Sequence, residues 1–319
     1  MNFSGYPSSN VIMQHRKDYI IGHISALGAY LIWGVLPIYW KQLDHVPAPE
    51  ILAHRIFWGF IFLLLFNLIS HRKRYFNLLK HRKKRNSMFL TAGLIAINWM
   101  IFIYAVTSEQ ILAASLGYFI NPLVSVMLGM IFLKEKLNPL KTIAIIFALT
   151  GVAYLGFNYG KLPWISAGLA LSFGLYGMFK KIFNLDSINS IMIETMTLSV
   201  VGVAFITILG IKGEGHFLVH SLSTDIYLVI SGIVTMLPLF LFAEGARKIP
   251  LSSVGFLQYF APTLMFLIGV LKYKEPLTNT YLISFLFIWT GLAFYSANLV
   301  RNQFRRRAYN RKRTSGKID

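Results

Sequence analysis

The chain has 319 residues, of which 55% are hydrophobic and 13% are charged, with a formal net charge of +19 and no cysteine. Soluble domains carry about 25% charged residues, so this chain has too few polar residues to cover a water-soluble globule of its size. The composition therefore predicts a membrane protein. The lack of cysteine excludes disulfides, thiolate metal sites and a cysteine nucleophile.

Apolar stretches long enough to cross a bilayer recur along the whole chain. A helix needs about 20 mostly apolar residues for this, and the expected spans are 20–40, 50–70, 88–107, 111–133, 142–158, 163–179, 188–210, 225–244, 251–271 and 279–299. The loops are too short for a soluble domain, so we expect an all-α integral membrane protein of ten transmembrane helices. Residues 1–19 are polar and lack the apolar core of a cleaved signal, so the first span should be retained.

The 31 Lys and Arg residues are distributed asymmetrically. Both tails and alternate loops hold 25 of them, the remaining loops hold five, and Arg55 lies within a span. The positive-inside rule then predicts a multi-pass protein of the cell (inner or plasma) membrane with the N-tail 1–19, the loop 71–87 and the C-tail 301–319 in the cytoplasm. We expect the basic loop and tail to contact anionic lipids. No nucleic acid is expected, because no RNA-binding motif or zinc-finger spacing accompanies the charge.

The sequence repeats itself at one ungapped offset of 140 residues. Matched pairs include Gly28 with Gly168, Pro122 with Pro262, Lys134 and Glu135 with Lys274 and Glu275, and Gly151 with Gly291. The offset divides the spans into two units of five, at 20–160 and 161–300. Because five is odd, the second unit must be inverted in the membrane, which is the architecture that secondary transporters use for alternating access.

Five strings along the chain carry a family resemblance. They are AYLIWGVLPIYWK (29–41), EILAHR (50–55), INW (97–99), ASLGYFINPL (114–123) and GFLQYFAPTL (255–264). They resemble the RarD subfamily of EamA transporters, in the drug/metabolite transporter superfamily, and the resemblance covers about residues 19–300. It implies a ten-helix carrier of two inverted EamA repeats, with a central cavity built chiefly by spans one, three, four, six, eight and nine. The subfamily name reflects an association with chloramphenicol sensitivity, which does not identify a substrate.

Polar and aromatic residues gather near the middle of several expected spans. The fourth span carries a polar stripe at helical spacing, the ninth span repeats it, and a proline in each predicts a hinge at Pro122 and Pro262. We predict a substrate site lined by Trp33, Asn98, Trp99, Tyr118, Asn121, Gln258 and Tyr259. The alternative is that these residues serve interhelical hydrogen bonding and core packing.

Titratable residues within the spans offer further roles. His54 and Glu194 are candidates for proton coupling, with structural pairing of the Glu50 and His54 region as the alternative. Arg55 is expected to snorkel to the extracytoplasmic surface. The pairs that end spans four and nine are candidate gates or interfacial anchors: Lys134, Glu135, Lys274 and Glu275. Gly151 and Gly291 should allow close helix packing, within the chain or at a homodimer face.

The sequence contains no phosphate-binding loop, no H-E-x-x-H and no visible Ser-His-Asp pattern. We therefore predict a protein that is not an enzyme and has no metal or cofactor. The predicted function is a secondary transporter that exports small organic metabolites or drugs by alternating access, with a solute and protons as partners. The alternative is an intramembrane enzyme acting on lipid or lipid-linked substrates, which would need acidic or His clusters at one depth.

Overall fold

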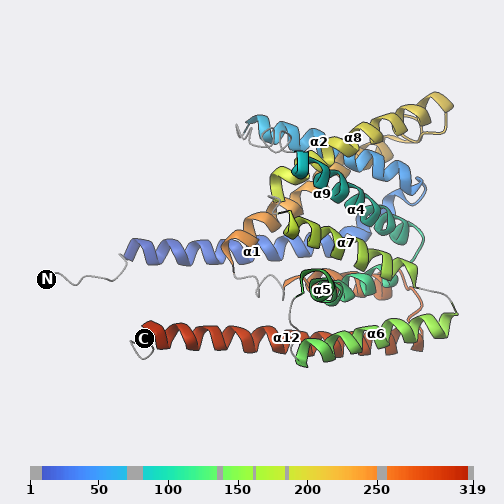
Figure 1. Cartoon of the computed structure of the whole chain (residues 1–319). Coiled ribbons are helices and arrows are strands. Elements are labelled where there is room, and N and C mark those ends of the chain that lie inside the picture. The colour runs from blue at the N-terminus through green and yellow to red at the C-terminus, as the bar shows by residue number, and fades with distance from the viewer. Residues whose placement is uncertain are drawn as a thin grey trace.

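The computed structural model describes residues 9–69, 82–134, 139–160, 163–183, 187–249 and 257–314, and all regular structure within them is helical (Figure 1). The helices are α1 (Ser9–Trp40), η1 (Lys41–Leu43), α2 (Ala48–Ile69), α4 (Arg82–Thr107), α5 (Ile111–Leu133), α6 (Pro139–Tyr159), α7 (Trp164–Ile182), α8 (Ser187–Lys212), α9 (Leu222–Lys248), α11 (Phe260–Leu267), η2 (Ile268–Lys272) and α12 (Asn279–Thr314). The predicted all-α class is confirmed for these residues.

Seven of the described helices are long and apolar enough to cross a membrane: α1, α2, α4, α5, α8, α9 and α12. Two shorter apolar segments, Thr142–Asn158 and Phe260–Lys272, accompany them. The outer surface of the bundle is also apolar, since Phe157 is 86% exposed and Val200 is 70% exposed. Apolar side chains on the outside are expected where helices face lipid rather than water. The number of ten spans remains a prediction.

The helices pack mainly in pairs that are distant in sequence. α1 lies along α9, α5 along α7 and α6 along α12, while α2 contacts both α8 and α9. In Figure 1, the N-terminal part of α1 and the C-terminal part of α12 extend from the same end of the bundle. With 32 and 36 residues, these helices are about 48 and about 54 Å long at 1.5 Å per residue. Both are longer than a hydrocarbon core of about 30 Å.

Small residues allow two of these helix pairs to approach closely. A Cβ atom at Gly151 would lie 2.9 Å from the Ser284 carbonyl oxygen, and one at Gly291 would lie 2.7 Å from the Ala144 carbonyl oxygen. The predicted role of Gly151 and Gly291 in close packing is confirmed, and the packing is between α6 and α12 of one chain. At Gly232 a Cβ atom would lie 2.5 Å from the backbone of Trp58, so α2 and α9 also meet at a glycine.

The two predicted hinge prolines occupy different positions in their helices. Pro122 lies inside α5, whereas Pro262 lies in the first turn of α11, directly after a turn at Gln258 and Tyr259. Pro262 thus begins a helix rather than interrupting one, and the hinge role of both prolines remains a prediction. A proline has no N–H to continue the helical ladder, and its ring crowds the carbonyl group four residues earlier, which here belongs to Gln258.

Candidate functional site

A buried arginine lies inside the helix bundle. Arg55 is the eighth residue of α2, about 10 Å along the helix from its start by the 1.5 Å rise per residue. Its guanidinium carbon lies 4.3 Å from the ring centroid of Trp99 and 5.1 Å from that of Trp40. Only 4% of Arg55 is exposed, so the prediction that it snorkels to the surface is wrong. α2 packs against α4, α8 and α9, which turns this side chain inward.

The hydrogen bonds of Arg55 are incomplete within the described part of the chain. Its Nε and Nη1 atoms are buried without a hydrogen-bond partner, and no described carboxylate lies within 4 Å. The two indole faces stabilise the positive charge through cation–π attraction. They do not accept hydrogen bonds from the guanidinium N–H groups as an oxygen atom would.

Three predicted site residues meet beside this arginine. Asn98 donates from Nδ2 to the Leu169 carbonyl oxygen and to Ser172 Oγ, both at 3.0 Å, which connects α4 to α7. The Tyr118 hydroxyl of α5 donates to Asn98 Oδ1 at 3.5 Å. Trp99 contacts Arg55 as described above. The structure thus brings Asn98, Trp99 and Tyr118 together, with the Asn98 amide already used for packing.

The remaining predicted substrate residues lie on α1, on α5 and in the turn before α11. Trp33 packs against Tyr30 and Phe242, at 5.4 and 5.7 Å between ring centroids. Asn121 Oδ1 is buried and has no hydrogen-bond partner among the described residues. Gln258 and Tyr259 are half-buried in the turn before α11. Trp33 and Tyr118 pack against the same hydrophobic cluster that contains Trp99, and a substrate site lined by all seven residues remains a prediction.

Glu50 and His54 do not pair with each other. The Glu50 carboxylate accepts hydrogen bonds from the backbone N–H of His216, at 2.7 Å, and contacts His216 Nδ1 at 2.8 Å. His54 is 1% exposed and its ring lies 4.8 Å from that of Phe217, between centroids. Neither ring nitrogen of His54 has a partner in the described residues. The expected structural pairing within α2 is thus replaced by a contact to the loop after α8.

Glu194 of α8 is surrounded by donors from two other helices. Thr91 Oγ1 donates to its Oε1 at 2.7 Å, the Tyr176 hydroxyl donates to its Oε2 at 3.1 Å, and Lys180 Nζ lies 3.4 Å from Oε2. The sequence showed no partner within the helix of Glu194. The structure supplies a cation from α7, so the carboxylate is paired across helices.

The candidate gate residues divide into caps and turns. Glu275 accepts the backbone N–H groups of Ile111 and Leu112 at 2.7 and 2.8 Å, and so caps the start of α5. Burial raises the pKa of Glu275 above its ordinary value, and these two donors partly offset the effect. Lys134 and Lys274 are exposed and adopt left-handed backbone conformations with φ of 53° and 52°. Glu135 lies outside the described residues.

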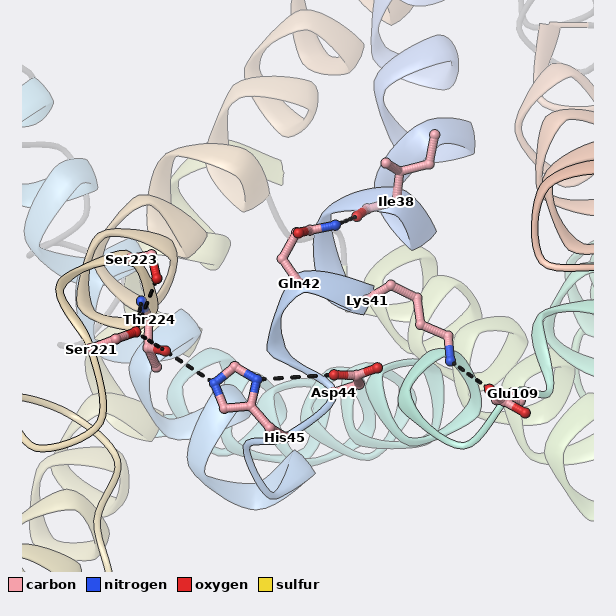
Figure 2. Close-up of polar contacts among 9 residues, drawn as sticks. All are labelled: Ile38, Lys41, Gln42, Asp44, His45, Glu109, Ser221, Ser223 and Thr224. Carbon is pink, nitrogen blue, oxygen red and sulfur yellow. Dashed lines mark hydrogen bonds and ion pairs between the residues drawn. The ribbon is translucent and has the colours of Figure 1, made fainter.

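A polar network covers the end of the bundle between α1, α2 and α9 (Figure 2). His45 Nε2 lies 3.0 Å from Thr224 Oγ1, and its other ring nitrogen lies 3.9 Å from Asp44. Lys41 contacts Glu109 at 3.4 Å in the same region. Burial, followed by the neighbouring His220, lowers the pKa of His45 below its ordinary value.

Sequence reasoning missed two features of this site. It named Arg55 but placed it at the surface, although a charge among expected span residues is itself a signal of an interior role. It also overlooked Lys180, which lies at the end of α7 and reaches Glu194. A carboxylate inside a span requires a cation or several donors, so a search of neighbouring spans for lysine would have found this pair.

Comparison with known proteins agrees with this architecture. The family model described as the EamA-like transporter family matches residues 20–157 and again residues 163–297. The uncharacterized transporter YojE of Bacillus subtilis (strain 168) is 41% identical over 294 residues, which cover 91% of this chain and 97% of that protein. Protein RarD of Escherichia coli (strain K12) is 39% identical over 285 residues, covering 89% and 96%.

One solved crystal structure has a similar fold, with a TM-score of 0.57 over 88% of this chain and 99% of that one. At 17% identity this likeness concerns the fold alone. The family model spans most of the chain, and relatives at 39–41% identity match it over nearly their full length. The chain therefore belongs to the RarD subfamily of the EamA-like transporter family, a family of membrane transporters.

Proposed function

We propose that the protein is a secondary transporter that exports small organic metabolites or drugs across the cell membrane by alternating access. Two inverted five-helix halves, 20–160 and 161–300, would exchange conformations and expose a central site to either side in turn. Both termini, including the tails 1–19 and 301–319, would lie in the cytoplasm. The basic loop and tail would contact anionic lipids.

The observation that carries this proposal is the reciprocal packing of α6 and α12. Gly151 faces Ser284, and Gly291 faces Ala144; at the repeat offset, Ser284 is the counterpart of Ala144 and Gly291 that of Gly151. Phe147 likewise contacts its own counterpart Phe287, with ring centroids 6.1 Å apart. When a two-fold axis relates two units, each contact from the first unit to the second has an equivalent contact from the second to the first. In Figure 1, α6 and α12 run in opposite directions, as inversion requires.

Two further observations support the two-unit organisation. Lys134, which directly follows α5, and Lys274, which lies two residues after the end of η2, share the same unusual positive φ. Non-glycine residues rarely adopt this conformation, so its recurrence at matched positions favours a common origin of the two turns. The family model also matches the chain twice, once in each half.

The solute site is proposed beside Arg55. Its lining would include Trp99 of α4 and Tyr118 and Asn121 of α5. Asn121 is the better candidate ligand among the amides, because its Oδ1 has no partner in the described residues, whereas Asn98 is already bonded to α7. Trp33, Gln258 and Tyr259 would join the lining in another conformation of the cycle. Pro122 would serve as the hinge in α5 and Pro262 at the start of α11.

Proton coupling is proposed through Glu194, with His54 as the second candidate. In the described conformation Glu194 is ion-paired with Lys180, so proton uptake by Glu194 would compete with this ion pair during the cycle. Gate roles are proposed for Lys134 with Glu135 and for Lys274 with Glu275. The cap that Glu275 forms on α5 would open when this end of the bundle opens.

An intramembrane enzyme is the alternative function. It would need several acidic or histidine side chains at one point, and the described residues contain no group of three that could hold a metal ion. His54 lies against the loop after α8, while Glu194 lies in the first third of that helix. The names of the relatives also favour a transporter over an enzyme.

Transport can be tested in proteoliposomes loaded with a metabolite extract, with and without a pH gradient, by mass spectrometry of released solutes. We expect protein-dependent release of a small set of organic solutes, and loss of this release in Asn121→Leu. Gln258→Leu tests the second half of the site, and Glu109→Gln, a change at an exposed side chain, is the matched control. No release above that of empty liposomes would contradict a carrier, and unchanged release by both leucine variants together would contradict the site.

The role of protons is tested in the same vesicles. Glu194→Gln should preserve solute exchange and abolish accumulation driven by a pH gradient. If this variant still concentrates solute when the gradient is applied, Glu194 is structural and His54→Gln becomes the next variant to measure.

A further inference from the structure

We propose that Arg55 is an anion-binding subsite and that the transported solute carries a carboxylate group on an apolar or aromatic body. This inference rests on the proposed carrier function and names the chemistry that its central site would recognise. It follows from how the buried charges of the described residues are compensated.

The other buried charged side chains of the described residues have compensating protein groups. Glu194 contacts Lys180, Glu50 contacts His216, and Glu275 accepts two backbone N–H groups of α5. Arg55 has no such partner: no described acidic side chain lies within 4 Å, and two of its three guanidinium nitrogens are buried without an acceptor. A charge at this depth is costly and marks a functional site when no protein group neutralises it.

The surroundings of Arg55 suit an anion better than a second protein charge. Trp40 and Trp99 present their ring faces to the guanidinium group and so stabilise its charge. The N–H groups remain available, and a guanidinium group offers them as a planar fork that matches the two oxygens of a carboxylate. The subsite thus combines a cation, which has free hydrogen-bond donors, with the aromatic rings beside it.

Hydroxyl groups beside the arginine can complete the recognition. Tyr39 and Tyr118 both lie near enough to interact electrostatically with Arg55. The hydroxyl of Tyr39 is engaged by the Tyr227 carbonyl oxygen, but the bond from Tyr118 to Asn98 is long, at 3.5 Å. Tyr118 is therefore the hydroxyl that can turn toward a bound carboxylate. Aromatic side chains around it would contact the apolar body of the solute.

The test compares carboxylates with their neutral amides on purified full-length protein in detergent. The probes are benzoate with benzamide, and indole-3-acetate with indole-3-acetamide, and the readouts are the thermal unfolding midpoint and tryptophan fluorescence, since two tryptophans flank Arg55. We expect at least one carboxylate to bind about tenfold more tightly than its amide. Equal responses to the members of both pairs in the wild-type protein would overturn the proposal.

Variants then assign the preference to this side chain. Arg55→Gln should bind the carboxylate and the amide equally, while Arg55→Lys, which keeps the charge and loses the fork, should retain a reduced preference and serves if the glutamine variant does not fold. Arg82→Gln removes an exposed charge at the start of α4 and should behave as wild type. A preference that persists unchanged in both Arg55 variants would also overturn the proposal. Because binding is measured without transport, a negative result here leaves the carrier function to be judged by the vesicle assay.

Discussion

Replacing Glu275 with Gln would show how the chain after η2 secures the start of α5. The two carboxylate oxygens accept the N–H groups of Ile111 and Leu112, and the N-cap residue, Gln110, contributes no side-chain hydrogen bond of its own. A glutamine side chain replaces one of these two oxygens with an NH2 group, which cannot accept the N–H group that this oxygen now bonds. It also removes the negative charge from a helix N-terminus, where an anion is favourable.

The size of the effect follows from these two losses. A lost N-cap hydrogen bond costs about 0.5–2 kcal/mol, and a lost charge at a partly buried helix end costs about 0.3–2 kcal/mol. We therefore expect Glu275→Gln to lower the free energy of unfolding by about 1–3 kcal/mol. Glu109→Gln is the matched control, because it removes the same charge at the same end of the bundle. Glu109 is 81% exposed and contacts Lys41, and such exposed pairs contribute about 0–1 kcal/mol.

Both variants would be measured by unfolding in detergent and by solute exchange in proteoliposomes. A cap role predicts a clearly lower unfolding midpoint for Glu275→Gln than for Glu109→Gln. Equal midpoints for the two variants would refute this reasoning. A change in the exchange rate with no loss of stability would instead support a role for Glu275 as a gate.

Three further predictions concern pH, packing and topology. His45 binds a proton less readily in the folded protein than in the unfolded chain, because its pKa is lower in the folded protein. It therefore contributes stability that is lost as the pH falls below the unfolded pKa of about 6.5. His45→Gln should reduce the drop in unfolding midpoint between about pH 7.5 and about pH 5.5. Gly232→Ala should destabilise by about 1–3 kcal/mol because its Cβ would meet the α2 backbone, whereas Gly93→Ala, which faces open space, should be neutral or stabilise by up to about 1 kcal/mol. In intact cells a membrane-impermeant maleimide should label Leu218→Cys, a position that is 77% exposed, and should label Arg301→Cys only after permeabilisation. The reverse labelling pattern would contradict the proposed orientation.

The positions of the helices are largely determined by the sequence. The expected spans 50–70 and 111–133 correspond to α2 (Ala48–Ile69) and α5 (Ile111–Leu133). This agreement has a local cause: a segment within lipid must satisfy its own backbone hydrogen bonds, so each apolar run of sufficient length forms a helix. The tails of α1 and α12 extend beyond the expected spans because polar residues outside the hydrocarbon core can continue a helix already begun.

The partners of the buried polar groups were decided only by the tertiary structure. His54 is four residues from Glu50 and was the partner that helical spacing suggested, yet the carboxylate binds His216, which lies 166 positions away. Spacing along a helix determines which side chains share a face. It does not determine which loop folds over that face.

Arg55 shows the same limit most clearly. Its position near the start of α2 suggested a side chain that reaches the surface, but the rotation of α2 about its axis is set by packing against α4, α8 and α9. That rotation places the guanidinium group between Trp40 and Trp99, which come from two other helices. A pattern within one span records its length and hydrophobicity, whereas the direction in which each residue points depends on neighbouring helices that are distant in sequence.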